Sequence, residues 1–236
     1  AAMAHAEKLL ADGAHILDIG GESTRPGSPA VPLDEELRRV LPVVQAAVAL
    51  QVPISVDTYK PEVMQAALDA GVDIINDIWA LRQPGARAVV AAHPRCGVCL
   101  MHMHANPQTM HLQHMDTAQD VTAQVLQFLQ QQTLELCAQG VQKSRIVWDA
   151  GTGFGKTVEQ SFALLQQQPV LAATGYPLLA GWSRKGSLGK VTGREVGERM
   201  PASIAAALLA VEHGAAVVRV HDVRETRDAL AVLAAM

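Results

Sequence analysis

Short apolar runs alternate along the chain with longer amphipathic stretches, and the runs repeatedly end in polar or charged residues. The runs have the length of β-strands, and most are apolar throughout, which is typical of parallel strands buried on both faces. Seven strands are therefore predicted, at His15–Gly20, Pro53–Asp57, Val72–Ile78, Gly97–Met103, Arg145–Asp149, Pro177–Ser183 and Ala215–His221.

One helix is predicted before the first strand, and a helix follows each strand. The expected ranges are Ala2–Ala11, Asp34–Leu50, a helix from Pro61 to just before Gly71, Gly85–Ala92, Thr117–Gln139, a helix that begins at Thr157–Gln166, Met200–Glu212 and Val223–Ala235. Such repetition produces either a doubly wound sheet or a barrel. An eighth strand before Ala2 would complete a barrel, so we expect an α/β fold of the (β/α)8 TIM-barrel type without its first strand.

Length and composition narrow the class of protein. The chain has 236 residues, close to the roughly 250 of one such barrel, so residues 1–236 are expected to form a single domain. Apolar residues make up 49% and charged residues 18%, which excludes a disordered chain. A net charge of −4 without a basic block argues against nucleic acid as a partner, and no apolar run is long enough to span a membrane.

Cysteine and histidine residues indicate no metal centre. Three cysteines favour a reducing compartment, and Cys99 of the Cys-x-x-Cys pair with Cys96 lies in an apolar run, which favours a core position over a redox or zinc role. His111 and His114 lie in a polar loop near Asp116, in an arrangement that matches no metal motif. A solvated loop is the preferred interpretation there.

The segment Gly20–Gly27, which reads GGESTRPG, follows the first predicted strand. Its glycines allow backbone N–H groups to approach an anion, Ser23 and Thr24 add hydroxyls, and Arg25 carries a guanidinium that matches phosphate oxygens. The alternative is an ordinary turn with a surface arginine.

Asp57, Asn76 and Asp149 each end or nearly end a predicted strand. Because parallel barrel strands end on one face, two carboxylates and an amide should meet at one mouth. Such a group suits a planar ligand with adjacent N–H donors, whereas the alternative for each residue is a cap of the following helix.

Residues 149–156 read DAGTGFGK and resemble the end of a phosphate loop, but Ala150 occupies the place of an essential glycine. We interpret this segment as a flexible loop that folds against a flat ligand, with Phe154 available to stack.

Cations end the last two predicted strands. Ser183 and Lys185 are expected to share one face, and Arg219 and His221 another, where barrels of this type frequently bind phosphate. Water-exposed surface cations are one alternative. A Schiff base on Lys185 is another, although the carboxylates favour a planar heterocycle.

Together these motifs resemble dihydropteroate synthases, a family of pterin-binding enzymes of folate biosynthesis. The resemblance rests, in order, on GGESTRPG (20–27), SVDT (55–58), NDI (76–78), CLMHM (99–103), DxGxGFGK (149–156), SRK (183–185) and RVHD (219–222). It implies condensation of 6-hydroxymethyl-7,8-dihydropterin diphosphate with 4-aminobenzoate to give 7,8-dihydropteroate and diphosphate. It also implies Mg²⁺ as cofactor, a homodimer, a cytoplasmic location and inhibition by sulfonamides.

The resemblance assigns roles to particular residues. Catalytic roles fall to Arg25, Lys185, Arg219 and His221, which with Mg²⁺ would stabilise the leaving diphosphate. Substrate contacts fall to Thr24, Arg25, Asp57, Asn76, Ile78, Met101, Asp149, Phe154, Ser183, Lys185, Arg219 and His221. Asp57 and Asp149 would favour the pterin cation that forms when diphosphate departs.

Two features depart from the family pattern. An Asn-x-Thr-x-Asp-Ser-Phe type motif, whose Asn helps to hold Mg²⁺, does not occur in this sequence, so the metal ligands are unknown. The family usually has Pro and a larger apolar residue at the positions of Ala150 and Thr152. This difference bears on how stiff the loop is expected to be, and the resemblance itself is unaffected. Without the first strand, the chain is expected to retain part of its pterin binding and to lose Mg²⁺-dependent condensation.

Two other functions stay open at this point. A pterin-dependent methyltransferase would share the barrel and the carboxylates, but it should lack the anion-binding residues of STRPG and SRK. A pterin-binding protein without catalytic activity is the alternative from a different class.

Overall fold

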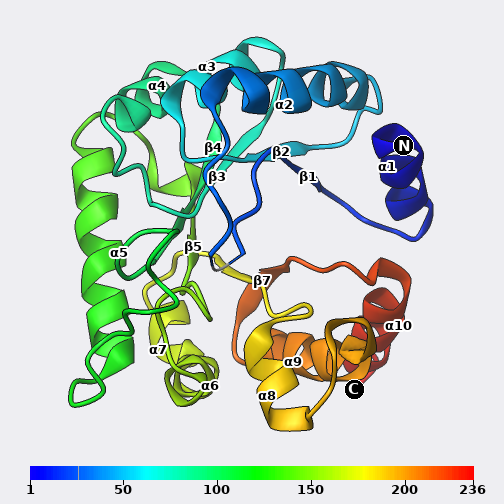
Figure 1. Ribbon diagram of the computed structural model, residues 1–236, viewed down its shortest axis with the longest axis vertical. Helices are drawn as coiled ribbons and strands as arrows, with labels where there is room; N and C mark the ends of the chain where they lie inside the picture. Colours follow the sequence, from blue (N-terminus) through cyan, green and yellow to red (C-terminus); the bar gives the residue numbers. More distant parts are fainter. Residues whose placement is uncertain (26) are drawn as a thin grey trace.

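Seven parallel strands form one curved sheet in the computed structural model, which describes residues 1–25 and 27–236. They are β1 (Leu17–Gly20), β2 (Ile54–Asp57), β3 (Ile74–Asp77), β4 (Gly97–Met101), β5 (Ile146–Asp149), β6 (Leu178–Ala180) and β7 (Ala215–Val218). They lie side by side in chain order, so β1 and β7 are the two edges (Figure 1). The incomplete parallel barrel expected from the sequence is confirmed.

Ten helices cover the outside of the sheet among the described residues (Figure 1). They are α1 (Ala2–Ala11), α2 (Leu33–Val48), α3 (Pro61–Asp69), α4 (Ala86–Ala92), α5 (Val121–Cys137), α6 (Val158–Gln166), α7 (Gln168–Ala172), α8 (Gly186–Thr192), α9 (Met200–Glu212) and α10 (Val223–Ala234). Single 3-10 turns occupy Lys143–Arg145 and Val196–Glu198. Over the described ranges, every helix is too short or too polar to cross a membrane.

An ion pair joins the first and last helices on the outside of the sheet. Arg224 of α10 donates from Nη2 to Oδ1 of Asp12, just after α1, at 2.7 Å, and Lys8 pairs with the same carboxylate. Because Asp12 precedes β1 by a few residues, this contact ties the N-terminal edge of the sheet to its C-terminal helix.

Apolar side chains fill the space between strands and helices. The largest cluster joins β3 to β6 with α3 to α7 and includes fully buried Trp148, while a second packs β1 and β2 against α2 and α3. Cys96 and Cys99 are buried and unoxidised, which confirms their expected core positions. The outer face of the sheet is thus fixed by packing, and its carboxyl edge is left to polar residues.

Several predicted boundaries differ from the observed ones by a few residues, and two of these differences affect the site or have a clear local cause. The strand expected at Pro177–Ser183 covers only Leu178–Ala180; its register with β7 is irregular between Leu178 and Leu179, and its last pair is Ala180 with Val218. The helix expected from Thr117 begins at Val121, where the carboxylate of Asp120 accepts hydrogen bonds from two backbone N–H groups and caps it. Helix α8, which the sequence analysis did not predict, follows β6 and places Lys185 at its N-cap.

We expect Thr133→Val to destabilise the fold. The Trp148 indole donates to Oγ1 of Thr133 at 2.8 Å, and both residues are buried. Valine keeps the shape of threonine but leaves the indole N–H unpaired, at a cost of about 1–3 kcal/mol. Urea unfolding of parent and variant measures the difference; equal midpoints would show that this hydrogen bond contributes nothing.

Candidate active site

Polar side chains in β2, β3 and β5 and directly after β7 converge at the carboxyl edge of the sheet. Register places Asp57 beside Gly20 and beside Asn76, and Asp149 beside Met101. Arg219 follows β7 directly, and its backbone N–H bonds to the carbonyl of Ala180 in β6. The structure therefore brings the expected carboxylates, amide and arginine to one mouth.

Two carboxylates and a guanidinium form the floor of this mouth. Arg219 donates from Nε to Oδ2 of Asp18 at 2.6 Å, and its Nη2 lies 3.5 Å from Oδ2 of Asp57. Asn76 Nδ2 donates to the same oxygen of Asp18 at 3.3 Å. The second oxygen of each carboxylate is buried without a hydrogen-bond partner in the described part of the chain.

Asp18 was not among the residues predicted from the sequence. Its signal is an acidic residue inside the short strand Leu-Asp-Ile-Gly, two positions before Gly20. Since Gly20 pairs with Asp57, the alternation of a strand puts Asp18 on the face of Asp57. Asp18 lies inside β1, so it belongs neither to the polar strand ends nor to the loop motifs that point to the other candidate residues.

Burial governs the charge of these carboxylates. Loss of solvent raises the pKa of Asp57 to about 7, with the Asp18 charge acting in the same direction and Arg219 against it. Burial also raises the pKa of Asp149, opposed by the backbone N–H of Gly151, which donates to its Oδ1 at 2.7 Å, and by the charge of Lys185. The site therefore favours ligands that donate hydrogen bonds or carry positive charge.

An apolar wall stands beside the carboxylates. Ile78, Met101 and Phe154 belong to one buried cluster, which also contains Met103 and Met110. Lys185 Nζ lies 4.1 Å from the centre of the Phe154 ring. This wall suits a flat apolar ring face, with a cation at its rim.

The loop between β5 and α6 is tightly held, so the expected flexible loop was wrong. Lys156 is buried, and its Nζ donates to the carbonyls of Gly151 at 2.8 Å and of Phe154 and His102 at 3.2 Å each. It also contacts Nδ1 of His102 at 2.9 Å. A Cβ at Gly151 would lie 1.9 Å from the His102 carbonyl oxygen, so only glycine fits this approach. Lys156 therefore holds the loop in place through hydrogen bonds to its backbone and is not positioned to bind a phosphate.

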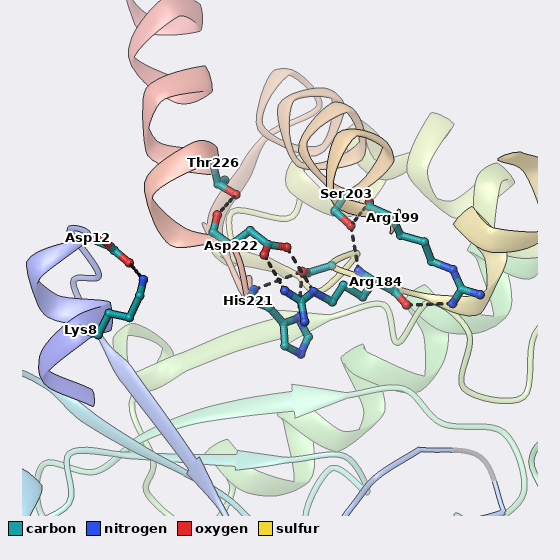
Figure 2. A network of polar contacts seen from close by, with 9 residues as sticks. Lys8, Asp12, Arg184, Arg199, Ser203, His221, Asp222 and Thr226 are labelled. Atoms are coloured by element: carbon teal, nitrogen blue, oxygen red, sulfur yellow. Dashed lines mark hydrogen bonds and ion pairs between the residues drawn. The ribbon is translucent and has the colours of Figure 1, made fainter. Parts of the chain in front are cut away.

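The opposite side of the mouth carries serine, histidine and arginine. Ser183 Oγ accepts from the backbone N–H of His221 at 3.1 Å and contacts its Nδ1 at 2.9 Å. Arg184 forms a two-point ion pair with Asp222 and receives support from Ser203, whose Oγ accepts from its backbone N–H at 2.9 Å (Figure 2). Burial and the charges of Arg184 and Arg219 lower the pKa of His221.

Lys185 does not share a strand face with Ser183, because β6 ends at Ala180 and Arg184 has a left-handed φ of 59°. This turn brings Lys185 to the N-cap of α8, where burial lowers its pKa to about 8 and Asp149 opposes the shift. A cation there favours an anionic partner.

Thr24 and Arg25 lie in the loop after β1, and Pro26 of the same motif lies outside the described residues. Lys60 anchors this loop, because its Nζ donates to Glu22 at 2.6 Å and pairs with buried Glu36. Tyr59 donates its hydroxyl to Glu22 at 2.8 Å. The charge of Arg25 contributes to lowering the pKa of His221, which puts the loop within electrostatic reach of the far side of the mouth.

Within residues 1–25 and 27–236, no group of three or more His, Cys, Asp and Glu side chains could hold a metal ion. His111 and His114 are exposed, as the solvated-loop interpretation predicts. The described residues therefore do not fit a metal held mainly by protein ligands.

Comparisons with known proteins agree on one family. The family model described as pterin binding enzyme matches residues 1–221. A dihydropteroate synthase of Neisseria meningitidis serogroup B is 46% identical over 240 residues, covering 100% of this chain and 84% of the relative.

Solved structures give the same result. The dihydropteroate synthase of Burkholderia cenocepacia, complexed with 7,8-dihydropteroate, has a TM-score of 0.92 and 52% identity over 99% of this chain and 85% of its own. The Yersinia pestis enzyme in a sulfonamide drug complex has a TM-score of 0.95 and 39% identity, over 99% and 84% of the two chains.

We expect Asp57→Asn to be more stable than the parent near neutral pH and to lose this advantage toward about pH 4. An Asp with a folded pKa of about 7 and an ordinary value of 3.8 favours folding only while protonated, so its contribution is lost as the pH rises from the lower to the higher value. The neutral amide avoids this loss. Urea unfolding over that range measures it; a difference independent of pH would contradict the raised pKa.

Lys156→Met should lower the free energy of unfolding by at least about 1–3 kcal/mol, because buried carbonyl oxygens lose their donor. The loop of residues 150–157 should also become sensitive to proteolysis. Lys190→Met, at an exposed position of α8, is the matched control and should change neither property. Equal behaviour of the two variants would show that Lys156 does not fasten the loop.

Proposed function

This chain belongs to the dihydropteroate synthase family of pterin-binding enzymes, and from that premise we propose that it condenses 6-hydroxymethyl-7,8-dihydropterin diphosphate with 4-aminobenzoate. The products are 7,8-dihydropteroate and diphosphate. The observation that carries the proposal is that three kinds of group lie together at the carboxyl edge of the sheet. They are the carboxylates of Asp18 and Asp57, the apolar cluster that contains Phe154, and the ammonium group of Lys185.

Asp57, Asn76 and Asp149 bind the polar edge of the pterin in this proposal. A carboxylate accepts paired N–H donors, and the unpartnered oxygen of Asp57 is an acceptor that no described side chain satisfies. Ile78, Met101 and Phe154 contact the faces of the ring, since they form the adjoining apolar wall.

The cations bind the diphosphate and the aminobenzoate. The leaving group is surrounded by Arg25, Lys185, Arg219 and His221. Hydroxyl donors come from Thr24 and Ser183. His221 with a lowered pKa is neutral near neutral pH, so it acts as a hydrogen-bond donor rather than as a charge.

In the reaction, the bond between the pterin methylene and the diphosphate oxygen breaks, and its electron pair leaves with the diphosphate. The methylene cation, delocalised into the ring, is favoured by Asp57 and Asp149. The amine nitrogen of 4-aminobenzoate then forms the C–N bond and releases a proton to water. Each preorganised donor toward the leaving group contributes about 3–4 kcal/mol in comparable enzymes.

We propose Mg²⁺ as the cofactor; bound with the diphosphate, it would add positive charge at the leaving group, and its protein ligands are not among the residues named above. Mg²⁺ commonly binds substrate phosphates with several waters and few protein ligands. No step assigned to the residues above depends on it.

We propose further that the protein is a homodimer of the cytoplasm. Exposed apolar side chains lie on or near α8, α9 and α10, and such side chains are common at subunit contacts; they are Val191, Val196, Met200, Leu209 and Val232. Three free cysteines suit a reducing compartment. Sedimentation analysis tests the oligomeric state.

Calorimetric titration with the pterin diphosphate, followed by measurement of diphosphate release with 4-aminobenzoate, tests the function. The proposal expects the 236 residues to bind the pterin diphosphate, and it expects aminobenzoate-dependent release when a strand with the Asn-x-Thr-x-Asp-Ser motif is added at the N-terminus. Binding without release in both proteins would indicate a pterin-binding protein without catalytic activity. Binding of a pterin methyl donor in preference to the diphosphate would indicate a methyltransferase.

We expect Lys185→Ala and Arg219→Ala to weaken binding of the pterin diphosphate more than binding of the free hydroxymethyl pterin. The diphosphate can form charge-assisted hydrogen bonds that the alcohol cannot, and each contributes about 1.5–3 kcal/mol. Titrations of both ligands, with and without Mg²⁺, measure this difference. Equal losses for the two ligands would assign these side chains to the ring or to the fold.

A further inference from the structure

Asp18 contacts two residues of the site at once through a single oxygen. Its Oδ2 accepts from Nε of Arg219 at 2.6 Å and from Nδ2 of Asn76 at 3.3 Å. Its side chain retains only 16% exposure. The family comparison and the strand-end pattern assign no role to Asp18, although two residues of the proposed site depend on it for their orientation.

The first consequence concerns the amide of Asn76. A carboxylate only accepts hydrogen bonds, so its contact turns the NH₂ group of Asn76 toward Asp18. The amide oxygen is then turned away from Asp18 and can accept from a ligand. With a neutral amide at position 18, this orientation would no longer be enforced, because an amide can both donate and accept.

The second consequence concerns Arg219. Asp18 holds its Nε, while Nη2 lies beside Asp57. A guanidinium has five donors in a fixed plane, so two anchoring contacts orient the remaining N–H groups. Removal of the Asp18 contact would leave Arg219, whose side chain is 43% exposed, with the longer contact to Asp57 alone.

The third consequence concerns charge. Asp18 and Asp57 share one guanidinium, and each keeps one buried oxygen without a partner in the described ranges. The charge of Asp18 raises the pKa of Asp57, next to the larger effect of burial. Other groups that face Asp57 or act on it by charge are Asn76 and Asp77 of β3, Glu36 of α2, Cys99 of β4, Lys185 and Arg219.

We propose that Asp18 is a positioning residue of the pterin site, which orients Asn76 and Arg219 together and couples its charge to that of Asp57. The inference rests on the proposed function, since it identifies pterin as the ligand that benefits from this orientation. Asp18 itself need not touch the pterin.

The test uses Asp18→Asn, which keeps the size of the side chain and removes its charge. Affinity for the pterin diphosphate should fall about tenfold or more, as expected for losing one charge-assisted hydrogen bond. The apparent pKa in the pH profile of binding should also fall, by about one unit, because Asp57 no longer faces a like charge. A purely structural Asp18 would lower stability without moving this profile.

Asp73→Asn is the matched control. Asp73 lies just before β3, at the opposite end of the strands, and its carboxylate accepts from the backbone N–H of Ile54 at 2.9 Å. This variant also loses one charge and leaves its hydrogen bond without charge assistance, but both the pterin affinity and its pH profile should stay at the parent values. Asp18→Glu restores the charge at a displaced position, so it should retain the parent pH profile while binding weakly.

Carbon-13 NMR of the Asp57 carboxyl group in the ligand-free protein tests the effect of the Asp18 charge without any substrate. The pKa of Asp57 should be lower in Asp18→Asn than in the parent, whereas Asp73→Asn should leave it at the parent value. An unchanged Asp57 pKa in Asp18→Asn, or an Asp18→Asn variant with parent affinity and parent pH profile, would overturn the inference. A parent protein that does not bind pterin, but whose Asp57 pKa still falls in Asp18→Asn, would contradict the proposed function and leave the effect of Asp18 on Asp57 supported.

Discussion

Arg219 links the last strand of the sheet to the first two, because its guanidinium lies between the carboxylates of Asp18 in β1 and Asp57 in β2. The backbone hydrogen bonds of the sheet do not connect β7 to β1, so side chains carry this connection at the carboxyl edge. On the outside, the ion pair between Asp12 and Arg224 makes a second link. The shape of the mouth therefore depends on ion pairs as well as on packing.

Ion pairs of this kind are costly to bury, and here they are only partly compensated. Each carboxylate has an oxygen that finds no donor among the described residues, and burial raises the pKa of Asp57 to about 7. In a purely structural core, apolar residues of the same volume would often serve as well or better. Unsatisfied acceptors at the carboxyl edge of a parallel sheet are instead expected where a ligand supplies the missing donors, and where folding stability is given up for binding.

Much of the fold could be predicted from the sequence, because parallel strands buried on both faces leave long apolar runs and the helix boundaries have clear Gly, Pro and acidic signals. Asp57, Asn76 and Asp149 were found for the same reason, as polar ends of apolar runs. Asp18 was missed because it lies inside a strand, and its function depends on Arg219, 201 positions away. Such a contact exists only after the sheet has curved.

Local geometry accounts for the other errors. The loop of residues 150–157 has many glycines, which suggested flexibility, yet Gly151 is required there by the close approach of the His102 carbonyl. Lys156 then binds backbone oxygens, whose positions no sequence pattern reveals. Lys185 was expected to share a strand face with Ser183, because neither the end of β6 at Ala180 nor the left-handed turn at Arg184 has a signature in the sequence.

The cations near the site differ in whether a carboxylate already pairs with them, and this difference indicates which of them would bind an anion. Arg219 is paired with Asp18, Arg184 with Asp222, and Lys60 with Glu22 and Glu36. Lys185, by contrast, takes part in none of the ion pairs formed by the described residues; it lies over the Phe154 ring and has a pKa lowered to about 8. Burial disfavours the charge of Lys185 more than the nearby Asp149 favours it, so an incoming diphosphate would stabilise that charge and gain from it in return. Lys185 therefore carries an electrostatic cost in the ligand-free protein that binding of the diphosphate would reduce.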